Sequence, residues 1–512
     1  MKNKRMLSTA MLALLLLSAA ACAEDPGTTP TETASQTDAS SAETAAPEAL
    51  EDTLFPKLNY AFPEADCGGE VIRILTRSDE LFASEMDVAE ADGDTINDAV
   101  FYRNLAVEER YNVTIEGFSD ATGNDWHGPE NAERVVLSGD TTVDMIVGSS
   151  YGIMPLTANS LYMNLRDLNN LDLTQKCWSQ ELLKRATIHG QTFAASGSIA
   201  LNFFKRAYAL ALNRPLFSTY DVSVDDLYEQ VKAGTWTMDR MIEITKDIYQ
   251  DVNGDGKPDA NDVHGCGILL NCMNDGWWSS CDISMATVDA DGALQIDVDL
   301  DKLETVNEKL RNYIWVSGGV LPMSEDTIYS REITAGKDQN PFYEDKLCMT
   351  TIRMEFTETP AMRNMKSDYG IVPYPKFDEN QSQYYSYIHD AFSIVMIPVS
   401  CEDPEIAAMI MQALAVEGHN TVMPAYYDIV LSEKYMRDQT SVDMLNIIYE
   451  GVTLDTGWLF SNMLNYAPQL LLRHQVWENK SDLQSTYASL SKQLEKSLAK
   501  INDGYQKITE GN

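Results

Sequence analysis

Short apolar runs alternate with segments of helical periodicity along most of this chain. Runs rich in β-branched residues predict strands, and apolar residues recurring every three or four positions predict helices. The predicted strands span residues 69–76, 113–115, 143–148, 207–213, 347–352, 369–372 and 392–397, and the predicted helices span 97–111, 224–231, 237–249, 404–415 and 481–505. Ser481 and Gln484 have the spacing of a capping box for the last helix. This alternation predicts a layered α/β body with much parallel pairing.

The first residues carry a different pattern. Lys2, Lys4 and Arg5 precede an apolar stretch over 6–17 that is too short to span a bilayer, and small residues follow it. This pattern is typical of a secretory signal. Cys22 comes directly after three alanines, and small residues before Cys are what a lipoprotein signal peptidase accepts. We therefore expect a signal peptide over 1–21 and a fatty acid such as palmitate on Cys22. The alternative is an ordinary signal beside a chance cysteine.

Residues 22–68 are dominated at their start by Thr, Ser, Ala, Glu, Asp and Pro. This composition supplies too little apolar surface to offset the entropy of ordering the chain. The sequence therefore predicts a disordered acidic tether that holds the body clear of the outer face of the cell membrane. The body after residue 68 is longer than one hydrophobic core normally supports, which predicts two lobes.

Acidic residues outnumber basic ones by 78 to 38, and the formal net charge is −40. Such a charge argues against partners that attract basic surfaces, namely nucleic acid and anionic lipid headgroups. It favours neutral or cationic ligands, or metal ions. Export permits disulfides, and Cys266, Cys272 and Cys281 are close enough in sequence for one bridge. We expect most of the cysteines to be buried as small apolar residues.

Residues 251–262 read DVNGDGKPDAND. A twelve-residue calcium loop needs oxygen donors at places one, three, five, nine and twelve, a backbone carbonyl at seven and Gly at six. The oxygen donors here are Asp251, Asn253, Asp255, Asp259 and Asp262. Lys257 supplies the backbone carbonyl at place seven, and Gly256 is at place six. The loop therefore predicts a structural Ca²⁺, although its twelfth residue is Asp rather than the usual Glu. The alternative is a solvated acidic turn without an ion.

The motifs of serine hydrolases, zinc proteases, P-loop enzymes and dinucleotide-binding enzymes are absent, and the six histidines show no pair at ligand spacing. The sequence thus predicts a protein that is not an enzyme. Aromatic residues in polar segments, including Tyr151, Trp277 and Trp278, offer flat faces that suit sugar rings, with core packing as the alternative. Because neighbouring residues of a strand face opposite sides, we expect one of the two tryptophans to be exposed.

Several short segments carry a family resemblance. They are VDMIVGSSYG at 143–152, NLRDL at 164–168, ALNRPLF at 211–217, AGTWTMDRMIEI at 233–244, EDKLCMTTI at 344–352 and YGIVPYPK at 369–376. Together with the alanines before Cys22, and in this order, they make the chain resemble the substrate-binding lipoproteins of carbohydrate ABC importers, which are extracellular solute-binding proteins of family 1.

The resemblance implies an α/β fold of the type II periplasmic-binding-protein kind, with two lobes joined by a hinge. Lobe one would hold residues 69–205 plus 391–435, and lobe two would hold 206–390 plus 436–512. The loops that form the cleft in such proteins match six residues as ligand-binding candidates here: Ser149, Tyr151, Trp277, Trp278, Arg353 and Asp390.

These observations predict a lipid-anchored, extracytoplasmic solute-binding protein that acts as a monomer. It would capture a mono- or oligosaccharide, leave it unchanged and deliver it to the membrane subunits of an ABC importer. Two alternatives from other classes remain at this point: an exported glycan-active enzyme, and a surface scaffold protein that depends on the calcium loop.

Overall fold

The computed structural model describes residues 54–78, 80–119, 132–323, 340–431 and 439–510. The predicted signal peptide and Cys22 lie outside the described residues. Residues 54–68, which the sequence analysis placed in the tether, lie instead against the body. Phe55 is buried against Phe204 and Tyr427, and the Leu58 amide donates to Asn420 Oδ1 at 2.8 Å. The apolar residues at this end of the predicted tether explain the difference.

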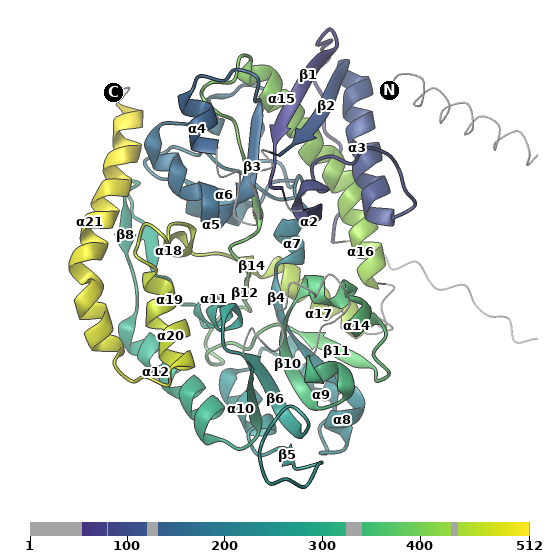
Figure 1. Ribbon diagram of the computed structural model, residues 1–512, viewed down its shortest axis with the longest axis vertical. Coiled ribbons are helices and arrows are strands. Elements are labelled where there is room, and N and C mark those ends of the chain that lie inside the picture. Colours follow the sequence, from purple (N-terminus) through teal and green to yellow (C-terminus); the bar gives the residue numbers. More distant parts are fainter. Residues whose placement is uncertain (1–53, 79, 120–131, 324–339, 432–438, 511–512) are drawn as a thin grey trace, which may run out of the picture. The chain divides into compact units, whose positions relative to one another are not determined.

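The first sheet has four strands in the order β13-β3-β1-β2 (Figure 1). β1 (Glu70–Leu75) pairs in parallel with β2 (Val113–Phe118) and with β3 (Met145–Ser149). β13 (Ser393–Met396), which comes from much later in the chain, pairs antiparallel with β3. All five residues of β3 are buried, as expected for a central strand covered on both faces. The four strands confirm the corresponding predictions.

Helix α3 (Thr95–Tyr111) connects the first two strands of this sheet and contacts α15 (Pro404–Glu417). The side chain of Asp94 caps its start by accepting from the amides of Ile96 and Asn97. At its end, Asn112 takes a left-handed conformation with φ of 51°, which turns the chain directly into β2.

The second sheet is built mainly from β11, β4, β10, β6 and β5 in that order, with β9 pairing to β6. The strands are β4 (Tyr208–Asn213), β5 (Tyr249–Gln250), β6 (Val263–Leu269), β9 (Val320–Met323), β10 (Leu347–Arg353) and β11 (Tyr369–Val372). Parallel pairs join β6 to β9 and β10, whereas β4 is antiparallel to both of its neighbours. The pairing in this sheet is therefore mixed, with substantial parallel pairing as predicted. Every residue of β4, β6 and β10 is buried, which makes this sheet the core of the second half.

The chain crosses between the two sheets at neighbouring places. It leaves the first half through α7 (Asn202–Lys205) into β4 and returns from β12 (Ser386–Tyr387) to β13. Ala207 and Ile388 form an isolated bridge between the crossings, and the His389 amide donates to the Arg206 carbonyl at 3.1 Å. Two short paired crossings are what a hinge between lobes requires.

The C-terminal part of the chain contacts both halves. α17 (Gln439–Glu450) packs on β11, whereas α18 (Thr456–Leu459) contacts α5 (Ser150–Ile153) of the first half. The long helix α21 (Leu483–Thr509) follows one side of the molecule in Figure 1 and reaches η1 (Met154–Asn159) of the first half. The division of the chain into lobes at the predicted boundaries stays a prediction, but the residues after 436 do not contact lobe two alone.

Shorter elements complete the structure. In the first half they are α2 (Glu80–Ala83), α4 (Ala132–Leu137), η2 (Leu165–Asp167), α6 (Gln180–Ala186), η8 (Gly418–Val422) and α16 (Met423–Leu431). Around the second sheet they are α8 (Arg214–Ser218), α9 (Val224–Lys232), α10 (Met238–Thr245), η3 (Cys272–Asp275), α11 (Gly276–Ser280), β7 (Ala286–Val288), β8 (Leu294–Ile296), α12 (Leu300–Arg311), η4 (Asn312–Val316), η6 (Pro341–Glu344), η7 (Met354–Glu358), α14 (Pro360–Arg363), β14 (Val452–Thr453), α19 (Ala467–Leu471) and α20 (Arg473–Trp477).

Two local predictions are wrong. The helix predicted over 237–249 ends at Thr245, where the Thr245 hydroxyl bonds to the Met241 carbonyl and to the Tyr313 hydroxyl, and the chain then enters β5. The last helix begins at Leu483 after Asp482, which makes no capping hydrogen bond with its side chain. Ser481 therefore does not cap it.

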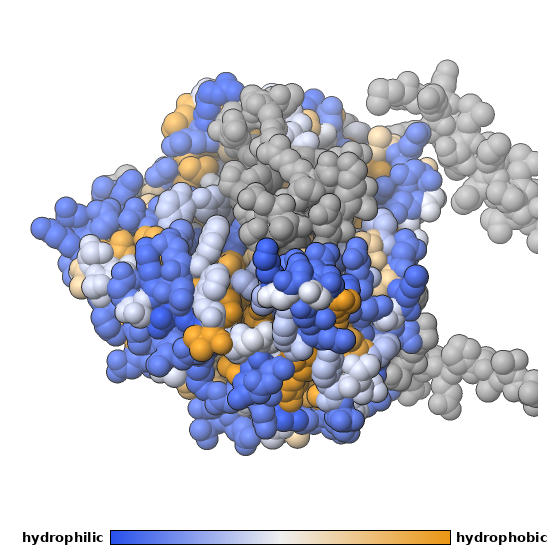
Figure 2. Space-filling model, turned by 60° about the horizontal axis from the view of Figure 1, so that its bottom comes forward, coloured by the Kyte–Doolittle hydropathy of each residue, from blue (hydrophilic) through white to orange (hydrophobic). Residues whose placement is uncertain are grey.

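The seven described cysteines are all free, and six of them are buried, with Cys67 partly exposed. The expectation of buried apolar cysteines is confirmed, and Cys266, Cys272 and Cys281 form no bridge. On the face drawn in Figure 2, hydrophilic side chains predominate and hydrophobic ones form small areas among them. Within the described parts of the chain, no helix combines the length and the apolar character that crossing a membrane would need.

Candidate functional site

The turn after β3 forms one wall of a site between the two sheets. Ser149 is buried, and its hydroxyl caps α5 by accepting from the Gly152 amide at 2.9 Å. The Tyr151 amide and the Ser150 hydroxyl both bond to the Asp390 carbonyl, at 3.0 and 2.8 Å. Three predicted ligand residues, Ser149, Tyr151 and Asp390, are thereby brought together, although the buried Ser149 serves the turn itself.

Charged side chains from both crossings and from β10 lie next to this turn. Arg353 and Arg206 both contact the Glu355 carboxylate, at 2.6 and 3.2 Å. Burial alone would raise the pKa of Glu355, but Arg206, Arg353 and Lys205 outweigh it and lower that pKa. Arg353, another predicted ligand residue, is thus held by an ion pair at the site.

The same surroundings shift the pKa values of His389 and Asp390 in opposite directions. Burial, reinforced by the nearby Arg353 and Arg206, holds the pKa of His389 well below its usual value. The imidazole is therefore neutral near pH 7, and its Nδ1 accepts from the Ala391 amide at 3.1 Å. Burial raises the pKa of Asp390, and Arg473 is the first of the cations that oppose this effect.

Asp275 and Arg473 form a second ion pair at the site. Arg473 Nε lies 2.9 Å from Asp275 Oδ1, and the other guanidinium arm contacts Oδ2, which gives the two-pronged geometry of a strong pair. Burial raises the pKa of Asp275 to about 6 in spite of the opposing guanidinium. No pattern in the sequence marked Arg473, because it comes from the long segment after residue 426 that lacks a clear period.

A row of aromatic rings lies beside these charges. The ring centroids follow one another from Trp277 to Tyr374 at 4.8 Å, Tyr374 to Tyr208 at 6.1 Å, Tyr208 to Tyr387 at 5.2 Å and Tyr387 to Trp458 at 5.5 Å. Offset or edge-on contacts of this kind stabilise ring clusters.

The expectation that one of Trp277 and Trp278 is exposed is wrong, since both are 0% exposed. They lie on the helix α11 rather than on a strand, and all five residues of α11 are buried. Neither tryptophan can therefore meet a ligand unless the surrounding elements move apart.

Several buried polar atoms around the rings have no hydrogen-bond partner in the described part of the chain. They are Trp277 Nε1, Trp278 Nε1, Trp458 Nε1, Asn274 Oδ1, Ser461 Oγ and Asn462 Oδ1. Buried polar groups are normally satisfied by protein, ordered water or a bound molecule. They lie on η3 and α11, and on and directly after α18, beside the rings of Trp277 and Trp458.

Tyr151 also meets Tyr466 across the site. The Tyr151 hydroxyl donates to the Tyr466 hydroxyl at 3.1 Å, and the rings are stacked with centroids 6.5 Å apart. Burial and this hydrogen bond raise the pKa of Tyr151. Sequence reasoning missed Tyr466, which lies in the same long segment as Arg473.

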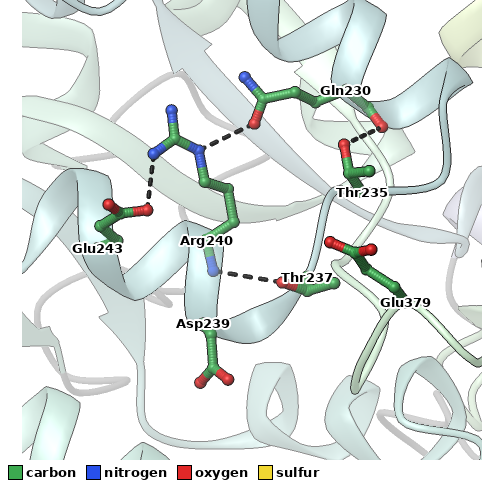
Figure 3. Close-up of a pocket in the computed structure, with 7 residues that line it drawn as sticks. All are labelled: Gln230, Thr235, Thr237, Asp239, Arg240, Glu243 and Glu379. Carbon is green, nitrogen blue, oxygen red and sulfur yellow. Dashed lines mark hydrogen bonds and ion pairs between the residues drawn. The ribbon is translucent and has the colours of Figure 1, made fainter.

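A surface hollow lies elsewhere, on the outer side of the second half. Its volume is about 580 Å³ and it is lined by Gln230, Thr235, Thr237, Asp239, Arg240, Glu243 and Glu379 (Figure 3). Arg240 is held by Gln230 at 2.9 Å and by Glu243 at 2.7 Å. Because Arg240 is already paired with its neighbours, and no lining residue belongs to the predicted set, we do not place the functional site there.

The predicted calcium loop is mostly exposed. Asp251 accepts from the amides of Gly254 and Gly256, whereas the buried Asp262 bonds to the Val252 amide and the Tyr249 hydroxyl at 3.0 and 3.1 Å. The Asp262 carboxylate thus accepts hydrogen bonds from residues at both ends of the loop and from β5. Over the described ranges, no three His, Cys, Asp or Glu side chains converge as a metal ion would need, so the calcium site stays a prediction.

Comparisons with known proteins place this arrangement in a fold class. No protein-family model matches the chain, and no curated protein sequence matches it. Among solved structures, the sugar-binding protein MalE from the phytopathogen Xanthomonas citri is similar, with 11% identity and a TM-score of 0.52 over 86% of this chain and 100% of that one. A cyclo/maltodextrin-binding protein complexed with maltotetraose has 11% identity and a TM-score of 0.51 over 86% of this chain and 98% of that one.

The fold is thus an α/β fold of the type II periplasmic-binding-protein kind, with two lobes joined by a hinge. This result confirms the predicted fold class. It also confirms the resemblance to sugar-binding proteins at the level of the fold. The groups described above lie where the two lobes meet, and we call them the inter-lobe site.

Proposed function

We propose that this protein is a lipid-anchored solute-binding protein on the outer face of the cell membrane, which captures a carbohydrate between its lobes for an ABC importer. It acts as a monomer and releases the sugar unchanged. The observation that carries the proposal is the inter-lobe site itself: aromatic rings, paired charges and unpartnered polar atoms from both lobes meet beside the two crossings. The similar sugar-binding proteins support the same conclusion.

The charges of the inter-lobe site favour a neutral ligand. Three cations, Arg206, Arg353 and Arg473, face three carboxyl groups, Glu355, Asp275 and Asp390. Since the charges balance, an ionic ligand would leave one buried charge without a partner, which is unfavourable. A sugar instead offers hydroxyl groups to the polar atoms and an apolar ring face to the aromatic side chains.

Titration calorimetry on the full chain tests the proposal. The probes are glucose, galactose, xylose, cellotetraose and maltotetraose, and the expected result is stoichiometric binding of at least one of them with no change in the sugar after incubation. Tyr102→Ala is the control variant, because Tyr102 is 52% exposed on α3. Failure of every sugar to bind would refute the carbohydrate proposal, and release of a cleaved product would favour a glycan-active enzyme instead.

The lipid anchor has its own test. Cells that express the chain are labelled with a palmitate analogue, and the labelled protein is followed into the membrane fraction. We expect Cys22→Ser to abolish both the labelling and the membrane association. Labelling that persists in the variant would place the lipid elsewhere.

A further inference from the structure

The segment 453–473 lies between the two lobes and bonds to both. On the lobe-one side, the Thr456 hydroxyl donates to the Arg185 carbonyl at 3.1 Å and Asn462 Nδ2 donates to the Tyr151 carbonyl at 3.2 Å. On the lobe-two side, Asp455 accepts from the Met285 amide at 2.9 Å. Figure 1 shows α18 of this segment beside α5 and α6, and contacts between these helices agree. We call residues 453–473 the bridging segment.

The bridging segment holds an unusual backbone conformation at an exposed turn between α18 and α19. Asn465 and Tyr466 have φ of 55° and 57°, in the left-handed region that Asn tolerates but that a bulky residue such as Tyr rarely adopts. The Tyr466 amide fixes this turn by donating to the Ser461 carbonyl at 2.7 Å. Strained conformations of this kind cluster at ligand clamps and active sites. Here the strain presents the Tyr466 ring, 44% exposed, to Tyr151 of lobe one.

The same segment carries polar groups that lack partners in the described structure. Trp458 and Ser461 are 2% and 1% exposed, and neither Trp458 Nε1 nor Ser461 Oγ makes a hydrogen bond. Asn462 uses its amide nitrogen on the Tyr151 carbonyl while its Oδ1 is left unpaired. Ser461 and Asn462 lie between Trp458 and Tyr466 along the chain, and polar groups next to aromatic rings are the combination that recognises a sugar.

The spacing of the two tyrosines suits a ring held between them. Their planes are 27° apart and their centroids are separated by 6.5 Å. A ring in van der Waals contact with both faces, at about 3.5–4.0 Å from each, needs a separation of about 7–8 Å. A small opening of the lobes therefore suffices, and it breaks the hydrogen bond between the two hydroxyls.

We propose that the bridging segment is a third wall of the inter-lobe site, in which Tyr466 and Tyr151 hold one sugar ring of the ligand between their faces and Asn462 binds a hydroxyl of that ring. This inference rests on the proposed function and identifies Tyr466 as a specificity-determining residue. A ligand with a flat apolar ring face is selected, because only such a face matches both tyrosines.

Titration calorimetry with the same five sugars tests the inference on three full-length variants. Tyr466→Ala removes the ring and is expected to weaken binding by about tenfold, from the usual strength of one ring contact. Tyr466→Phe keeps the ring and loses only a hydrogen bond that the ligand must break in any case, so its affinity is expected within about twofold of the unmodified protein. Tyr102→Ala, which alters an exposed tyrosine remote from the site, is expected to bind like the unmodified chain.

The outcomes separate the inference from the proposed function. If the unmodified protein binds none of the sugars, the proposed function is refuted and this inference with it. If the unmodified protein binds but Tyr466→Ala binds equally well, the third wall is refuted while the function stands. If Tyr466→Ala and Tyr466→Phe lose the same sugar affinity, the proposal that the Tyr466 ring stacks on the sugar is refuted. Circular dichroism of each variant establishes that it is folded.

Discussion

The burial of Asp275 makes the stability of this protein depend on pH, although the carboxyl is paired with Arg473. The Asp275 side chain is 3% exposed, and burial raises its pKa from 3.8 to about 6. A carboxyl with a raised pKa in the folded state favours folding while it is protonated. Its contribution is therefore fully present below pH 3.8 and is lost as the pH rises through 6, and this shift corresponds to about 3 kcal/mol.

Arg473→Met removes the guanidinium and leaves the carboxylate buried alone. At pH 8 we expect a loss of about 3–5 kcal/mol in the free energy of unfolding, as for other buried ion pairs broken from one side. At pH 5 we expect a loss of only about 1–2 kcal/mol, because a protonated Asp275 carries no charge to be stranded. The double variant Asp275→Asn with Arg473→Met is expected to recover most of the loss at pH 8.

Urea unfolding followed by tryptophan fluorescence at pH 5 and pH 8 measures these differences. Arg240→Met is a matched control, because Arg240 pairs with Glu243 on the surface, and such pairs contribute about 0–1 kcal/mol. If Arg473→Met loses the same free energy of unfolding at pH 5 and pH 8, the reasoning is refuted. A double variant no more stable than Arg473→Met alone would also refute it.

Three further predictions concern other parts of the chain. Calcium at 100 times its dissociation constant would stabilise the folded protein by about 2.7 kcal/mol. We therefore expect added Ca²⁺ to raise the melting temperature of the unmodified chain but not that of the double variant Asp251→Asn with Asp255→Asn. If the melting temperature rises in neither protein, the predicted calcium loop is contradicted. Tyr505→Phe should lower the free energy of unfolding by about 1 kcal/mol, because the buried Tyr505 hydroxyl bonds to the Thr157 hydroxyl at 2.6 Å. Urea unfolding measures this difference, and the control variant Tyr102→Phe should show none. Gly504→Ala should also destabilise the folded protein, because the added Cβ would lie 2.5 Å from the Ala158 carbonyl oxygen. This effect opposes the helix propensity of Ala, which is better than that of Gly by about 1 kcal/mol. A variant with a higher melting temperature in thermal unfolding would show that α21 is not fixed against Ala158.

The fold could be predicted from the sequence where local pattern and tertiary packing agree. β3 and β10 are buried on both faces and read as unbroken apolar runs, so both were found nearly to the residue. α15 was found for the same reason, since all the residues from Ala407 to Val416 are buried. The segment 237–249 shows where this fails, because the contact of Thr245 with Tyr313 ends the helix and local sequence does not contain that contact.

The inter-lobe site could be predicted only in part. Tyr151 and Asp390 lie just beyond strands and Arg353 is the last residue of β10. The ends of strands are where cleft residues of such folds lie, so the resemblance located all three. Tyr466 and Arg473 come from short helices and turns without a hydrophobic period, and their position depends on how the segment crosses the lobes. The expectation that one of Trp277 and Trp278 is exposed used the alternation of a strand, whereas both residues lie on the buried helix α11.

Three of the connections between the lobes differ in how easily they can separate. At the crossings, the bridge between Ala207 and Ile388 is part of the buried backbone. At the far side, Tyr505 and Thr157 are both fully buried, so separating them would strand two hydroxyl groups away from water. Between them, Tyr151 and Tyr466 meet where solvent reaches both side chains, and water can replace the hydrogen bond that they lose. Opening is therefore expected to begin at the tyrosine pair, so the contact that yields first is also the one proposed to hold the ligand.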